Sequence, residues 1–210
     1  MKILLTGDSI TDMCRQQDAA LPVFSYGSGY AFFVAGELTR RFPGKYEIFN
    51  RGIGGNRSVD LYARLERDCL ALRPDLVSVL IGVNDLWHGL SGAGISPAKY
   101  ERIYRAFLSE TREALPDVKF MILQPFVLDG SATRENREYF SGISAYAEIA
   151  EKLAAEFSAA FVPLQKAFDE VAEKYGAENW LYDGVHPAVA GAKLISEKWL
   201  EAFYGMGCKA

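Results

Sequence analysis

Five short apolar runs recur along this 210-residue chain and constrain its fold more than any other feature. They are rich in Val, Ile, Leu and Phe, and they are continuous rather than alternating, as strands covered on both faces require. The runs lie at 2–6, 46–50, 76–82, 119–124 and 159–164. We therefore predict five strands of a buried parallel sheet.

Segments with helical periodicity separate these strands. Within 144–157 the apolar residues fall at steps of three and four, which gives one stripe that a sheet can cover. That stripe consists of Tyr146, Ile149, Ala150, Leu153, Ala154 and Phe157. The same spacing relates Tyr62, Leu65, Cys69 and Leu72, and again Tyr100, Ile103, Tyr104, Phe107 and Leu108. Ser96 and Pro97 suit the N-cap and first turn of the last of these helices, and 187–204 is predicted as a closing helix.

Alternation of strands and helices predicts an α/β protein, a three-layer α/β/α sandwich with right-handed crossovers. The chain is 50% hydrophobic and 24% charged, without a repeat or a linker, so we expect residues 1–210 to form a single domain. Ligands of such sheets bind beyond the carboxyl ends of the strands, where the strand order reverses. The loops that follow the strands are therefore the place to look for a site.

Charge and hydropathy exclude several classes of partner. The formal net charge is -4 and Lys and Arg form no stripe, which argues against nucleic acid and against an anionic membrane surface. No apolar run approaches the length of a membrane span. The first strand starts too early for a secretory signal to precede it. We expect a cytoplasmic protein, although a chain from which a signal had been removed would look the same.

Cys14, Cys69 and Cys208 are odd in number and widely spaced, which argues against a disulfide framework and against a zinc site. We expect free thiols. Cys14 lies near Ser9 in the sequence, but nothing close to it would activate its thiol as a nucleophile.

Ser9 is the first candidate for chemistry, because it follows the first strand in the stretch GDSIT. A serine hydroxyl needs a base to take its proton during attack, and histidine is the usual choice. The chain has two histidines, His88 and His186. Asp183 precedes His186 by three residues in a glycine- and proline-containing loop, so its carboxylate can bond one imidazole nitrogen and leave the other for serine.

His88 has an aspartate at the same separation, Asp85, and is the rival base. However, Asp85 follows directly on the third strand, and no proline or comparable turn presents His88. We interpret His88 as solvated or as part of the cleft wall.

Attack on a carbonyl forms an oxyanion that fixed donors must hold. The stretch GIGGN offers the backbone N–H groups of Gly52, Gly54 and Gly55, and Asn84 offers a side-chain amide. With the N–H of Ser9, one of these glycines and Asn84 would make a three-donor hole. Taken singly, each of them is better explained by structure alone, the glycines by a turn and Asn84 by a cap.

Taken together, the blocks GDS, NxGxxG, GxND and DxxH follow the order found in the SGNH hydrolases, or GDSL esterases, and the sequence resembles that family over residues 2–200. The resemblance implies Ser9 as nucleophile, Gly55 and Asn84 as oxyanion-hole residues, and Asp183 and His186 as the rest of a catalytic triad. Stretches such as PDLVSVLIGVNDLW and YDGVHPAVAG look most like the acetylxylan esterase and carbohydrate-deacetylase branch.

The family fold is a five-stranded parallel sheet in the flavodoxin-like order, and the family needs no metal and no organic cofactor. Ile10 stands where the name-giving pattern has leucine, which is a conservative change. The rival serine-hydrolase elbow GxSxG and the phosphate-binding pattern GxxxxGK[ST] are both absent from the sequence.

The implied activity is a serine esterase that removes acetyl groups from xylo-oligosaccharides or related sugars through an acyl-enzyme. A short-chain carboxylesterase or thioesterase, a lysophospholipase, and a catalytically silent sugar-binding domain remain as alternatives. The expected partner is a small acyl ester or an acetylated oligosaccharide, and the sequence leaves a homo-oligomer open.

Candidate substrate contacts fall in or beside the cleft loops. They are Asp8, Tyr26, Tyr30, Trp87, His88, Trp180 and Tyr182. Flat rings can stack on sugar faces, but they can equally pack beneath loops. The polar segment 128–139 is expected to border the cleft, and Trp199 and Phe203 of the closing helix are expected in the core.

Overall fold

The computed structural model describes residues 1–207 and contains one parallel sheet of five strands. The strands are β1 (Lys2–Gly7), β2 (Glu47–Asn50), β3 (Leu76–Leu80), β4 (Lys119–Leu123) and β5 (Ala160–Val162). Their spatial order is β2-β1-β3-β4-β5, and every neighbouring pair is parallel. This is the flavodoxin-like order, so the predicted fold class is confirmed.

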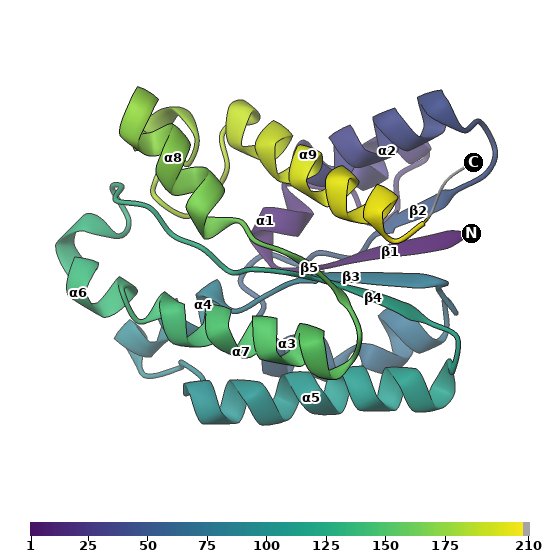
Figure 1. Cartoon of the computed structure of the whole chain (residues 1–210), viewed down its shortest axis with the longest axis horizontal. Helices are drawn as coiled ribbons and strands as arrows, with labels where there is room; N and C mark the ends of the chain where they lie inside the picture. Colours follow the sequence, from purple (N-terminus) through teal and green to yellow (C-terminus); the bar gives the residue numbers. More distant parts are fainter. Residues whose placement is uncertain (208–210) are drawn as a thin grey trace.

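Helices cover both faces of the sheet, as Figure 1 shows. One face carries α2 (Tyr30–Arg41), α8 (Gln165–Tyr175) and α9 (Val189–Gly205). The other carries α3 (Ser58–Ala63), α5 (Pro97–Ala114) and α7 (Ile143–Glu156). Three short helices, α1 (Ser9–Asp12), α4 (Val83–Trp87) and α6 (Arg137–Phe140), lie in the loops that follow β1, β3 and β4.

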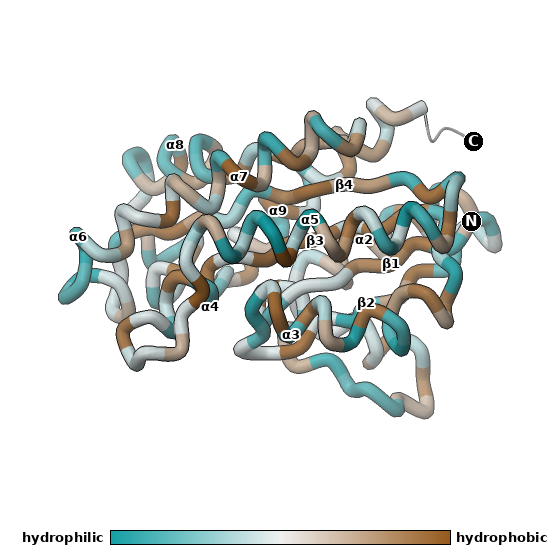
Figure 2. Tube along the Cα trace, turned by 90° about the horizontal axis from the view of Figure 1, so that it is seen from below, coloured by the Kyte–Doolittle hydropathy of each residue, from teal (hydrophilic) through white to brown (hydrophobic). Residues whose placement is uncertain are grey.

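The core lies in the two spaces between the sheet and its helices. All five residues of β3 are buried, and β1 and β4 are coloured as mainly hydrophobic in Figure 2. Trp199 and Phe203 of α9 are 0% exposed, as expected for core residues. The Trp199 indole N–H donates to Ser78 Oγ of β3 at 2.8 Å, which satisfies both polar groups inside the core.

Three local predictions differ from the structure. The helical stripe around Tyr62 to Leu72 is not one α-helix, because α3 ends at Ala63 and a π-helical turn spans Glu66–Leu70. Ser96 does precede the first residue of α5, but its side chain makes no capping hydrogen bond. The strand at 159–164 is only three residues long, because Pro163 cannot donate to the ladder.

The chain leaves β1 for β2 on one side and returns to β3 on the other, so the strand order reverses at β1. Loops that diverge from such a point leave a crevice at the carboxyl edge of the sheet. No helix among residues 1–207 is long and apolar enough to cross a membrane. Cys14 and Cys69 are free thiols, and Cys208 lies outside the described residues.

Candidate active site

Ser9 lies at the carboxyl edge of the sheet, as the first residue of α1. The preceding strand ends in Gly7 because β1 and β3 approach closely there: a Cβ on Gly7 would lie 2.1 Å from the Leu80 carbonyl oxygen. Asp8 then caps α1, its Oδ1 accepting the Ile10 N–H at 2.9 Å. The two residues together turn the chain out of the sheet at Ser9.

His186 and Asp183 reach Ser9 from the far end of the chain. Ser9 Oγ lies 2.9 Å from His186 Nε2, and His186 Nδ1 lies 2.7 Å from Asp183 Oδ2. The other Asp183 oxygen, Oδ1, accepts the backbone N–H groups of Val185 and His186 at 2.9 and 2.8 Å. Hydroxyl, imidazole and carboxylate therefore stand in hydrogen-bonding order, the arrangement that lets a histidine take a proton from serine.

Hydrogen bonds keep the Asp183 carboxylate ionised. Burial alone would raise the pKa of Asp183, but the backbone N–H and ring of His186 and the N–H of Val185 lower it below its ordinary value. The loop itself is held by the segment 128–134: the Leu128 N–H donates to the Gly184 carbonyl at 2.8 Å, and the Ala132 N–H to the Asp183 carbonyl at 2.9 Å. The polar segment after β4 therefore packs against the Asp183 loop.

A cleft of about 470 Å³ opens over Ser9. Its lining consists of Ser9, Gly55, Asn84, Trp87, His88, Leu90, Ser91 and His186. Gly55 has a positive φ of 77°, a conformation that glycine adopts without strain. Asn84, on α4, is 5% exposed, and one N–H of its amide donates to the Asn56 carbonyl at 3.1 Å. Both predicted oxyanion residues thus share the cleft with the serine.

The candidate substrate contacts separate into two groups. Trp87 and His88 line the cleft, and the Tyr182 ring stacks on the His186 ring with centroids 5.7 Å apart while remaining 57% exposed. The structure does not place Asp8 or Tyr30 in the cleft, because they are 1% and 0% exposed. Their side chains lie beneath the site and have no surface to offer a substrate.

Two other aromatic candidates also lie outside the cleft lining. Trp180 packs beside Tyr175 with centroids 6.3 Å apart, and Tyr26 is half-buried against the core. In place of these residues the cleft wall uses Leu90 and Ser91, which the sequence analysis did not single out. Nothing in their local pattern distinguishes them from an ordinary loop.

Two carboxyl groups near the site, those of Asp8 and Asp85, are buried and interact electrostatically. Burial raises the pKa of Asp8 to about 7. The hydrogen bond from the Ile10 N–H opposes this rise, whereas the negative charge of Asp85 adds to it. Burial likewise raises the pKa of Asp85 to about 7, although the side chain and N–H of Ser58 donate to its carboxylate. Asp8 Oδ2 has no hydrogen-bond partner among the described residues, so the neutral carboxylic acid suits this position better than the carboxylate.

We expect the free energy of unfolding of the variant Asp8→Asn to depend less on pH than that of the wild type. Because the folded-state pKa of about 7 exceeds the ordinary 3.8, the contribution of Asp8 to stability is complete below about pH 4 and is lost as the pH rises through about 7. The wild-type free energy of unfolding should therefore fall between about pH 5 and about pH 8, with an Asp8 share on the order of 2 kcal/mol. Urea unfolding of the wild type and of Asp8→Asn at about pH 5 and about pH 8 measures this fall. An equal fall in Asp8→Asn would show that Asp8 is not the group that titrates.

Comparison with known proteins agrees with this geometry. The model of the GDSL-like Lipase/Acylhydrolase family matches residues 5–194. The chain belongs to this family. As a GDSL-like acylhydrolase it is a serine ester hydrolase, and its acetylxylan esterase relative supports the same class.

That relative is an acetylxylan esterase from Geobacillus stearothermophilus, 34% identical over 207 residues that cover 95% of this chain and 92% of the relative. A solved structure of the Geobacillus esterase superposes on this acylhydrolase with a TM-score of 0.85, covering 96% of this chain and 93% of the other at 32% identity. The solved structure of a Parabacteroides merdae protein described as a GDSL-like lipase superposes with a TM-score of 0.90 at 39% identity. The match covers 96% of this chain and 94% of the other.

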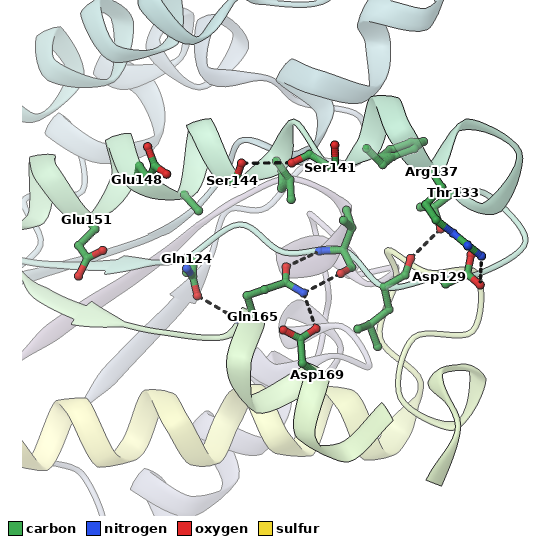
Figure 3. Close-up of a pocket in the computed structure, with 15 residues that line it drawn as sticks. Gln124, Asp129, Thr133, Arg137, Ser141, Ser144, Glu148, Glu151, Gln165 and Asp169 are labelled. Carbon is green, nitrogen blue, oxygen red and sulfur yellow. Dashed lines mark hydrogen bonds and ion pairs between the residues drawn. The ribbon is translucent and has the colours of Figure 1, made fainter. Parts of the chain in front are cut away.

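A second cavity of this GDSL-like acylhydrolase, about 520 Å³, lies beyond the carboxyl ends of β4 and β5 (Figure 3). Its polar groups bond to one another: the Gln165 amide donates to the Val127 carbonyl and to Asp169, and Arg137 pairs with Asp129. No histidine is among the described residues that line it. Within residues 1–207, the cavity shares no lining residue with the cleft over Ser9.

Proposed function

We propose that this chain is an acetylesterase for acetylated xylo-oligosaccharides or closely related sugars, with Ser9, His186 and Asp183 as its catalytic triad. The observation that carries the proposal is the pair of contacts at His186, 2.9 Å from Nε2 to Ser9 Oγ and 2.7 Å from Nδ1 to Asp183 Oδ2. A base within this distance of the hydroxyl, itself oriented by a carboxylate, is what activation of serine requires.

In the proposed reaction Ser9 Oγ attacks the ester carbonyl carbon while His186 Nε2 takes the hydroxyl proton. Asp183 stabilises the imidazolium that forms. The tetrahedral intermediate collapses, His186 gives the proton to the departing sugar oxygen, and an acetyl-serine remains. Water then attacks this ester with His186 again as base, which releases acetate and restores Ser9.

Three donors are proposed to hold the oxyanion: the backbone N–H groups of Ser9 and Gly55 and the side-chain amide of Asn84. A primary amide carries two N–H groups. Because one N–H of Asn84 already donates to the Asn56 carbonyl, its orientation is fixed and the other remains for the oxyanion. Donors fixed before the reaction stabilise the developing charge without reorganisation.

The substrate class is supported by the relative and by the cleft. The Geobacillus relative is named as an acetylxylan esterase, and two of its solved structures are described as catalytic mutants, one serine to alanine and one aspartate to alanine. The cleft here offers the Trp87 indole and the polar residues His88 and Ser91 in the same lining as Ser9. Aromatic surface with a few polar partners suits a sugar ring.

A substrate panel tests the proposal. Acetylated xylobiose, an acetyl thioester and a lysophospholipid should be compared by acid release, and kcat/KM should be greatest for the acetylated sugar. A preference for the thioester or for the lipid would replace the substrate class while keeping the esterase chemistry. A fluorophosphonate should label Ser9, and failure to label a folded protein would support a silent sugar-binding domain instead.

A further inference from the structure

Arg64 follows α3 and its side chain turns inward beneath the site rather than outward to solvent. The residue is 8% exposed, and its charge is balanced by Asp68, whose Oδ2 accepts from Nη1 at 2.6 Å. Three other acceptors surround the same guanidinium. They are the Gly7 carbonyl at 3.0 Å, the Arg51 carbonyl at 2.7 Å and Asn56 Oδ1 at 2.8 Å.

These acceptors lie next to the groups that would hold an oxyanion. Gly7 stands two residues before Ser9, and Asn56 directly follows Gly55. The main-chain carbonyl of Asn56 also accepts the Asn84 amide at 3.1 Å. One buried side chain therefore contacts the segments that present Ser9 and Gly55, and it is connected to Asn84 through Asn56.

A guanidinium suits this task because its N–H groups point in fixed directions within one plane. Arg64 uses Nε, Nη1 and Nη2 at once, so the end of β1 at Gly7 and the loop from Arg51 to Asn56 are fixed relative to one another. A lysine at this position has a single nitrogen and cannot reach the same three acceptors in the same geometry. Arg64 lies directly after the last residue of α3, Ala63, and before the π-helical turn at Glu66–Leu70.

We propose that Arg64 is a positioning residue of this esterase, which holds the oxyanion donors at Ser9, Gly55 and Asn84 in the arrangement that fits the tetrahedral intermediate. This inference rests on the proposed function. It differs from a purely structural role, because it states that loss of Arg64 weakens binding of the intermediate more than binding of the substrate. Misplacement of catalytic groups by about 1 Å costs about 100-fold in rate.

The test compares Arg64→Lys and Arg64→Met with the wild type on p-nitrophenyl acetate, and adds the inhibition constant of phenylboronic acid. Ser9 Oγ gives a lone pair to boron and its proton passes to His186 Nε2, so boron becomes a tetrahedral anion whose affinity reports on the oxyanion donors. We expect kcat to fall about 100-fold, KM to stay within about threefold, and the boronate affinity to fall with kcat.

Two further variants separate positioning from folding. Arg112→Met removes a half-buried arginine of α5 that lies over the Phe120 ring at the amino end of β4, and it should keep wild-type kcat and boronate affinity. Asn56→Ala removes one acceptor and leaves Arg64 in place, and we expect a smaller fall in kcat of the same kind. It provides the test if the Arg64 variants do not fold.

The outcomes are distinct. Folded Arg64 variants with wild-type kcat and boronate affinity would overturn the positioning role, and so would an equal loss of substrate and boronate binding. If Arg64→Met does not fold, an Asn56→Ala variant with unchanged kcat would overturn it as well. A wild-type protein that neither hydrolyses the acetate nor binds the boronate would instead contradict the proposed function.

Discussion

Replacement of Ser9 by alanine should abolish esterase turnover and leave the fold intact. Ser9 Oγ stands 2.9 Å from His186 Nε2 at the mouth of the cleft, so its removal takes away the group that would form the acyl-enzyme. We expect kcat on p-nitrophenyl acetate to fall by about 10⁴-fold or more, as for other serine hydrolases that lose the nucleophile. Circular dichroism and thermal unfolding should match the wild type.

The cleft supplies a matched control for this experiment. Ser91 lines the same cleft, but its hydroxyl donates to the His88 carbonyl at 3.0 Å and does not contact an imidazole. Ser91→Ala should therefore keep most of the activity. Full activity in Ser9→Ala, or an equally deep loss in Ser91→Ala, would mean that Ser9 is not the nucleophile.

The two histidines provide the second large effect. Both line the cleft, but among the described contacts only the His186 ring joins the hydroxyl of a serine to a carboxylate. His186→Ala should lose activity about as deeply as Ser9→Ala, because members of a triad act as a unit. His88→Ala should keep most of its activity on the same acetate ester.

The double variant makes this comparison sharper. Ser9→Ala combined with His186→Ala should be hardly less active than either single variant, since each already removes nucleophilic catalysis. Ser9→Ala combined with His88→Ala serves as the control pair. A loss in His88→Ala as deep as that in His186→Ala would assign the base to the wrong histidine.

Much of the fold follows from the sequence because its physical causes are local. Continuous apolar runs predict strands buried on both faces, and all five predicted strands occur in the sheet. The exact ends were less predictable: the last run covers 159–164, whereas β5 spans only Ala160–Val162. Pro163 limits its carboxyl end, whereas its amino end depends on how far it pairs with β4, which is a tertiary property.

The candidate triad also follows from local signals, because short spacings such as the three residues between Asp183 and His186 can be seen in the sequence. Side-chain depth cannot. Asp8 directly precedes Ser9 and Tyr30 begins α2, yet both side chains are buried and offer no surface to a substrate. Trp87 and Trp180 are both tryptophans near motif residues, but only Trp87 lines the cleft.

Arg64 shows why a positioning role is the hardest to predict. The residue lies among Leu61 and Leu65 in a stretch with helical spacing, where a charged side chain is normally expected to face solvent. Its actual direction is set by carbonyl groups of Gly7 and Arg51, which the fold brings together from two other segments. No pattern in the neighbourhood of residue 64 contains that information.

The hydrogen bond between Ser9 and His186 spans 177 positions of the chain. During synthesis from the amino end, Ser9 leaves the ribosome long before His186 has been translated. Until residues 183–186 have been synthesised, Ser9 of a nascent chain has neither the imidazole nor the carboxylate of the proposed triad. A chain that ends before Asp183 should therefore release no acetate from an acetyl ester, and activity in a coupled translation reaction should appear only after residues 183–186 have been synthesised and have folded onto Ser9.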